Sequence, residues 1–171
     1  MQFKYQRVPQ TRIGFLHMAI YELGIIKNGI LIFSKKYYEL DTERTEQAGN
    51  DQNLRSQLIS SIIHFANNCL STEVEYFLMR KYRIAIASSQ VQDKGMKNFV
   101  VAYIIGDNDL GVDIASESLN KLLDAFIVDY KDQFEIVEDT SKYDGFSTTL
   151  EEIFGDLHYR PLDRMRRLLS T

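Results

Sequence analysis

The chain has 171 residues, of which 44% are hydrophobic, and a formal net charge of −4 at pH 7. This size predicts one domain with a substantial core, and the small acidic charge argues against general nucleic-acid binding, which needs basic surface to neutralise phosphates. A single cysteine, Cys69, cannot form an internal disulfide and indicates a reducing compartment.

The N-terminal segment predicts neither a secretion signal nor a membrane anchor. Residues 1–14 form a basic arm with Lys4, Arg7 and Arg12 and without an acidic residue, and they lack the apolar core of a signal peptide. No apolar run approaches the roughly 20 residues that span a bilayer. We therefore expect a cytoplasmic protein without a transmembrane segment, with peripheral membrane contact left open.

The pair Asn28-Gly29 predicts a β-hairpin between strands at about 15–26 and 30–38. Asn and Gly accept the positive φ of a tight turn, and apolar residues flank the pair on both sides. The second strand opens with four successive apolar residues from Ile30, so both of its faces are apolar. This pattern predicts a strand in the sheet interior, or one beside a subunit contact.

A helix is predicted over about 51–70, with Asp51 as its N-cap. Apolar residues at spacings of three and four predict the face that packs on the core. This stripe consists of Leu54, Leu58, Ile62, Phe65, Ala66 and Cys69. Ile59 and Ile63 widen the apolar surface beyond the stripe, so we expect more than one neighbour to cover the helix.

Three further strands and a second long helix are predicted next. The strands span about 74–80, 82–88 and 98–105, and the last is the most hydrophobic, which predicts a central place in the sheet. Residues 89–97, which contain a glycine, are interpreted as a link. Helical spacing of apolar residues predicts the helix over about 109–131.

The C-terminal part predicts two short helices. Thr148 and Glu151 have capping-box spacing, which predicts a helix that ends near Phe154. The tail, residues 156–171, combines arginines with leucines and predicts a basic amphipathic helix that starts at Pro161.

Together these elements predict a single α/β domain with a central five-stranded antiparallel sheet, in the order strand, strand, helix, three strands, helix, short helix. The hairpin with its Asn-Gly turn, the Ile-Phe-Ser run after it and the Leu-Ile-Ser-Ser-Ile-Ile helix resemble longin domains and the related roadblock proteins of the profilin-like superfold. The resemblance covers about residues 15–155.

This resemblance implies a function in binding. Longin-like domains carry a small GTPase, take part in nucleotide exchange on one, or pair with another longin domain, and they are not used as enzymes. We therefore expect a non-enzymatic adaptor, scaffold or GTPase-regulatory platform in membrane trafficking or signalling, which forms homo- or heterodimers.

The residue pattern predicts no catalytic, cofactor or metal site. The three histidines lie in dissimilar contexts without metal-ligand spacing, and the sequence has no phosphate-binding loop. Asp107, Asp109 and Asp113 faintly resemble a calcium loop, but Ser118 stands where such a loop needs glutamate. Capping of the following helix by these carboxylates is favoured instead.

Three groups of residues carry binding hypotheses. Aromatic and basic side chains are enriched at interfaces, which makes two groups candidates for a protein partner: Lys35, Lys36, Tyr37 and Tyr38, and Arg80, Lys81 and Tyr82. Tyrosines that close the rim of the core explain the first group equally well. The third group predicts contact with an anionic partner or membrane surface: Arg160, Arg164, Arg166 and Arg167.

Two alternatives remain open at this stage. Residues 107–139 hold ten Asp or Glu against two Lys, which either steer a basic partner or form an ordinary solvated helix face. A small-molecule sensor of the PAS or GAF type also combines an antiparallel sheet with helices. Its pocket is expected between the first helix and the strand Phe99–Ile105.

Overall fold

The computed structural model describes residues 18–40, 52–134 and 139–170, except for the side chains of His158 and Leu168. Five strands form one antiparallel sheet in the order β2-β1-β5-β4-β3. The strands are β1 Ile20–Lys27, β2 Ile30–Lys36, β3 Tyr76–Leu78, β4 Arg83–Asp93 and β5 Met96–Gly106. The helices are α1 Gln52–Phe65, α2 Val112–Tyr130, α3 Phe146–Phe154 and α4 Pro161–Leu169. A π-helical turn, Ala66–Leu70, follows α1, and short 3-10 turns flank α3.

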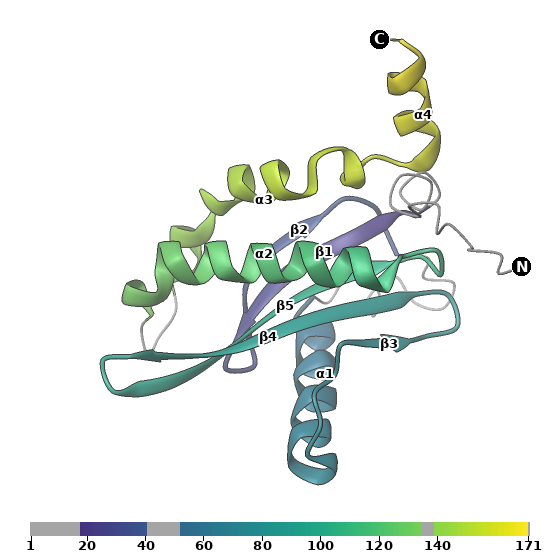
Figure 1. The fold of residues 1–171 in the computed structure, drawn as a ribbon. Coiled ribbons are helices and arrows are strands. Elements are labelled where there is room, and N and C mark those ends of the chain that lie inside the picture. Colours follow the sequence, from purple (N-terminus) through teal and green to yellow (C-terminus); the bar gives the residue numbers. More distant parts are fainter. Residues whose placement is uncertain (1–17, 41–51, 135–138, 171) are drawn as a thin grey trace, which may run out of the picture.

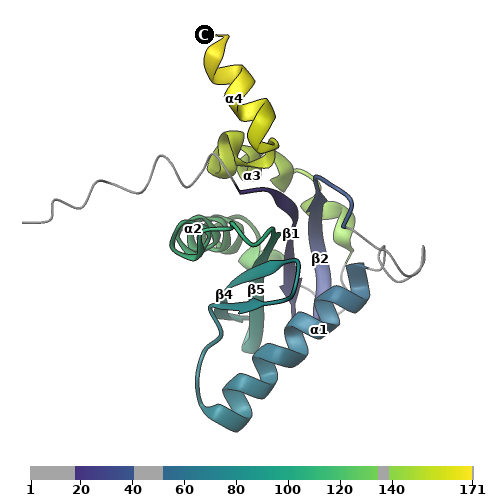
Figure 2. The same ribbon diagram turned by 90° about the vertical axis from the view of Figure 1, so that its right-hand side faces the viewer.

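The sheet is the middle layer, with α1 on one face and α2 and α3 on the other (Figures 1 and 2). Alternation along β5 creates two cores. Val100, Ala102 and Ile104 pack toward α2 and α3, whereas Tyr103 and its alternating neighbours pack toward α1. β5 has two strands on each side, so the predicted central strand is confirmed.

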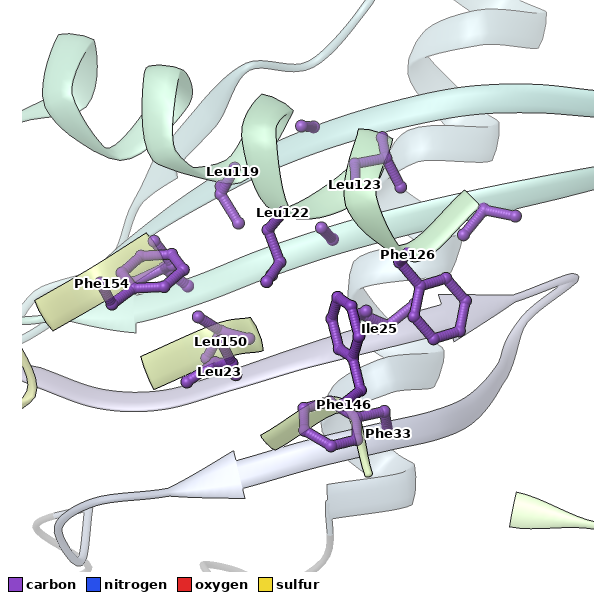
Figure 3. Packing of buried hydrophobic residues seen from close by; sticks show 14 of the residues in the cluster. Leu23, Ile25, Phe33, Leu119, Leu122, Leu123, Phe126, Phe146, Leu150 and Phe154 are labelled. Carbon is purple, nitrogen blue, oxygen red and sulfur yellow. The ribbon is translucent and has the colours of Figure 1, made fainter. Parts of the chain in front are cut away.

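The core on the α2 side is rich in aromatic side chains (Figure 3). The ring of Phe146 lies between Phe33 on β2 and Phe126 on α2, with ring centroids 5.7 and 5.1 Å apart. Both contacts have the edge-to-face geometry that aromatic pairs favour. Phe146 thereby fixes α3 to the sheet and to α2 together.

Two tight hairpins connect neighbouring strands. The predicted turn is confirmed, with φ of 49° at Asn28 and 86° at Gly29. The interpretation of residues 89–97 as a link is wrong, because β4 and β5 continue through them and turn only at Lys94 and Gly95, with φ of 47° and 81°. The segment is polar because much of this end of β4 faces solvent on one side.

β2 lies at the edge of the sheet, so its predicted interior position is wrong. Its unbroken apolar run has a local cause. The β1–β2 register pairs Ile25 with Phe33 and Ile26 with Leu31, so Ile32 is an extra residue that bulges. Ile32 and Phe33 consequently both pack into the core beneath α2 and α3.

α1 turns a different face to the sheet from the one predicted. Ile59 and Ile63 are buried on the sheet together with Ser56 and Ser60. The predicted stripe mostly faces solvent: Leu54 is 56% exposed, Leu58 45% and Phe65 59%, and Cys69 in the π-helical turn is exposed as well. The predicted N-cap, Asp51, lies outside the described residues.

The two C-terminal helices begin next to a glycine and at a proline, respectively. α3 begins at Phe146 after Gly145, so Thr148 lies inside the helix and the predicted capping box does not mark its start. α4 begins at Pro161, as predicted, because proline has the right φ and lacks only an amide that is unused in the first turn. Within the described ranges, no helix has the length and hydropathy needed to cross a bilayer.

Candidate binding surfaces

A buried charged cluster joins α1 to the sheet. The carboxylate of Glu22 on β1 is fully buried, accepts a 2.6 Å hydrogen bond from the Tyr103 hydroxyl and pairs with Arg55 on α1 at 2.5 Å. Burial, followed by the charge of Glu22, raises the pKa of Tyr103. Because these groups satisfy one another away from solvent, the cluster positions α1 and offers no reactive group to a ligand.

The cluster was not predicted from the sequence, although the isolated charges of Glu22 and Arg55 indicate it. Glu22 is the only charged residue in an otherwise apolar strand half, and Arg55 is the only Lys, Arg, Asp or Glu between residues 52 and 70. An isolated charge of each sign on two apolar elements indicates a buried pair, since an unpaired buried charge is costly.

Three tyrosines form a row across one end of the sheet. The ring of Tyr21 lies between Tyr38 and Tyr82, with centroid separations of 6.4 and 5.4 Å and edge-to-face geometry. The guanidinium of Arg160 lies 4.6 Å from the centroid of Tyr38. The structure therefore brings together one member of each predicted binding group, through a tyrosine that was not predicted.

A cavity of about 390 Å³ opens beside this row. Its lining residues are Ala19, Tyr21, Tyr38, Glu39, Asp107, Arg160 and Pro161. Both signs of charge line it, so it is not tuned to a simple anion or cation. A second, open cavity of about 380 Å³ is lined by residues Leu31 to Ser34 of the edge strand β2 and by Thr140, Asp144 and Ser147.

Asp107 ties β1 to the end of β5. Its carboxylate accepts hydrogen bonds from the backbone amides of Ala19 at 2.8 Å and Asp109 at 3.1 Å. Desolvation is the largest influence on this group and raises the pKa of Asp107. The helix-capping role expected of the acidic cluster is therefore wrong for Asp107, and the N-cap of α2 is Gly111. Asp113 does lie in the first turn of α2.

In the described part of the chain, no group of acidic, His or Cys side chains is arranged to hold a metal ion.

The remaining residues of the first two groups do not form a continuous patch. Lys35 lies 3.7 Å from Glu151, and Lys36 pairs with Glu39 at 2.5 Å. Tyr37 is half-buried against the core on the α2 side. Arg80 and Lys81 are exposed in the turn before Tyr82, where the Arg80 carbonyl accepts a hydrogen bond from Asn108.

The arginine group divides into one buried and three exposed residues. Arg164 is only 5% exposed and donates a hydrogen bond to the backbone carbonyl of Met18, so its predicted contact with an anionic partner is wrong. Arg160, Arg166 and Arg167 are exposed. Arg166 lies 3.6 Å from Asp163, and Arg167 lies 3.8 Å from Asp156.

The outward side of α1, hereafter the outer α1 face, was predicted to pack on the core but is exposed to solvent. It consists of Leu54, Leu58 and Phe65, three solvent-exposed residues. The exposed polar residues around them are uncharged Asn, Gln and Ser, apart from His64. Charge-poor apolar surface of this kind is typical of the centre of a protein interface.

Comparisons with protein-family models and with curated proteins find no match to the chain. The structure itself establishes a single α/β domain whose five-stranded antiparallel sheet packs against helices.

Proposed function

We propose that this chain is a non-enzymatic binding protein of the longin type, which pairs with a second copy of itself through the outer α1 face. In that form it serves as an adaptor or small-GTPase-regulatory platform. The observation that carries this proposal is the exposure of Leu54, Leu58 and Phe65 on a helix whose other side is already packed on the sheet.

Hydrophobic and electrostatic considerations both support a second copy as the occupant. Burying three large apolar side chains is favourable by roughly 1.5–3 kcal/mol each. The chain is acidic, with a net charge of −4, and a contact surface without charge avoids placing like charges of the two copies directly against each other. The outer α1 face meets that condition, because its one charged neighbour on the helix, Arg55, is engaged by Glu22.

The order of elements supports the longin assignment. Two strands, a helix, three strands and a helix are the pattern on which the resemblance rests, and the observed sheet is compatible with it. The partner class, a small GTPase, comes from that resemblance alone. We assign this partner to the tyrosine row, where Arg160 covers Tyr38, together with Arg80 and Lys81, the exposed residues directly before Tyr82 in the chain.

The sensor alternative receives less support. Its expected pocket lies between α1 and β5, where Ile59, Ile63 and Tyr103 are at most 2% exposed and pack together. The two cavities described above lie elsewhere, at the sheet end and along β2.

The pairing is tested by measuring mass in solution. We expect the wild-type chain to sediment as a dimer and Leu58→Glu to sediment as a monomer, because a carboxylate in the apolar contact is costly to bury. Val128→Glu is the matched control, since Val128 is a 73% exposed apolar residue on α2. A wild-type chain that stays monomeric at all concentrations, or a dimer that survives Leu58→Glu, contradicts the pairing.

The partner class is tested separately with a panel of purified small GTPases. We expect at least one to bind the chain or to exchange its nucleotide faster in the presence of the chain, and Lys81→Glu to weaken that effect. Dimer formation without any GTPase contact removes the regulatory half of the proposal and leaves the scaffold half.

A further inference from the structure

We propose that α4 is a peripheral membrane helix, which binds the surface of anionic lipid bilayers with its apolar side and its exposed arginines. This inference is independent of the pairing through the outer α1 face, because it concerns another element and another kind of partner.

The apolar residues of α4 share one side of the helix and face solvent. Leu162 is 68% exposed, Met165 45% and Leu169 86%. Their spacings of three and four place them on one stripe. The polar side holds Asp163 and the arginines of the tail, so α4 has the amphipathic, basic and only weakly hydrophobic character of helices that lie in the membrane interface.

The base of α4 is fixed to the body in an orientation that keeps this stripe outward. Arg164 points inward to the carbonyl of Met18, and Arg160, directly before the helix, covers the ring of Tyr38. In both views α4 projects away from the sheet and from α2 (Figures 1 and 2). This separation matters because α2 carries exposed carboxylates, such as Glu117 and Asp124, which an anionic surface repels.

The isolated position of the apolar stripe favours a bilayer over a protein as the partner. A stable protein contact takes about 800 Å² and 20–30 residues from each partner. The nine residues of α4 project away from the sheet and from α2, so those elements do not extend its surface toward that size (Figures 1 and 2). A bilayer needs no complementary groove. It accepts a few apolar side chains in its interface and adds attraction of roughly 1 kcal/mol for each Lys or Arg near its surface.

The charge of the bilayer, and not one specific headgroup, is what α4 recognises. The cavity at its base contains Arg160 but also Glu39 and Asp107, and these two carboxylates repel a phosphate group. Arg166 and Arg167 lie outside that cavity on the exposed helix surface, and each already has an aspartate within 4 Å. The contact is therefore diffuse and sensitive to salt.

The test is co-sedimentation of the full chain with vesicles. We expect binding to phosphatidylcholine vesicles that contain about 30% phosphatidylserine, little binding to pure phosphatidylcholine, and loss of binding as salt screens the surface potential. Leu162→Glu/Leu169→Glu should lower the partition coefficient by more than about tenfold, because two apolar anchors become anionic. Arg166→Gln/Arg167→Gln should lower it by about 30-fold, because two arginines contribute roughly 1 kcal/mol each.

Two controls make the result specific. Lys94→Gln/Lys97→Gln removes the same charge from exposed positions in or beside the β4–β5 turn and should leave vesicle binding within about twofold of wild type. Polyglutamate immobilised on a resin should not bind the chain. Equal binding to neutral and anionic vesicles, or unchanged vesicle binding of the leucine variant, overturns the membrane assignment. Binding to polyglutamate that is as strong for the leucine variant as for wild type also overturns it and indicates an acidic protein partner.

Discussion

Gly24 and Tyr103 lie opposite each other in the β1–β5 pair, and the Tyr103 ring occupies the space that a β-carbon at position 24 would need. The missing side chain lets the tyrosine lie flat across β1 and reach Glu22 with its hydroxyl. The glycine, the tyrosine and the buried carboxylate are therefore one arrangement, and α1 is attached to it through Arg55.

Gly24→Ala should destabilise the chain. The added β-carbon would lie 2.6 Å from three atoms of Tyr103, so the ring must move and strain its bond to Glu22. We expect a loss of about 1–3 kcal/mol in the free energy of unfolding, measured with urea. Gly111→Ala is the control, because its new β-carbon meets the nearest atom at 3.5 Å; equal losses in the two variants would refute the steric explanation.

Tyr103→Phe should lower stability at neutral pH and flatten its decline at high pH. The variant leaves Glu22 without one donor, which costs about 2 kcal/mol. Burial raises the pKa of Tyr103 above its ordinary value of 10.0. Above that pH the unfolded phenol loses its proton while the folded one keeps it, so the free energy of unfolding falls as pH rises.

The measurement is urea unfolding of both proteins from neutral to strongly alkaline pH. The difference between wild type and Tyr103→Phe should shrink above about pH 10, because only wild type carries this titrating group. Burial also raises the pKa of Tyr37, so the variant keeps part of the slope. A constant difference across the whole range would contradict the linkage.

Ile59→Ala and Leu58→Ala should separate the two sides of α1. Ile59 is completely buried on the sheet, and its truncation should cost about 3 kcal/mol. Leu58 is 45% exposed, and its truncation should cost less than about 0.5 kcal/mol in the isolated monomer. Urea unfolding of dilute, monomeric samples measures both losses. A larger loss for Leu58→Ala than for Ile59→Ala would contradict the burial of the Ile59 side of α1 on the sheet.

Arg164→Met should release α4 without unfolding the domain. The variant removes the buried hydrogen bond to Met18 and should speed amide hydrogen exchange in residues 163–169 by about tenfold. Exchange in β5 should not change. Arg166→Met, which alters an exposed arginine of the same helix, serves as the control. Unaltered exchange in α4 after Arg164→Met would show that another contact holds the helix.

Local chemistry made the elements themselves predictable. Asn28-Gly29 has few alternatives to a tight turn, a long apolar run such as β5 must be covered on both faces, and Pro161 suits the first turn of a helix and little else. The link predicted at residues 89–97 failed because one face of this end of β4 is open to solvent, at Ser88, Gln90 and Gln92, although Val91 and Asp93 on the other face are buried. The polar ends of β4 and β5 keep the pairing of a strand without its usual apolar alternation.

The candidate surfaces were predicted only in part. The aromatic groups near Tyr38 and Tyr82 were singled out, but their connection depends on Tyr21, which lies in another strand. The sequence does not distinguish Arg164 from Arg166 and Arg167, because all of them lie in the same short arginine- and leucine-rich tail. Its burial follows from the position of the Met18 carbonyl, 146 residues away in the chain.

The sequence by itself determined the order of the strands, the Asn28-Gly29 turn, most helix positions and the placement of β5 at the centre, because spacing and turn chemistry act between near neighbours. Only the tertiary structure decided which side of α1 faces the sheet. That helix is apolar on two sides, so periodicity allows either; the pairing of Arg55 with the buried Glu22 and Tyr103, far apart in the chain, selects one and leaves the other open to a partner.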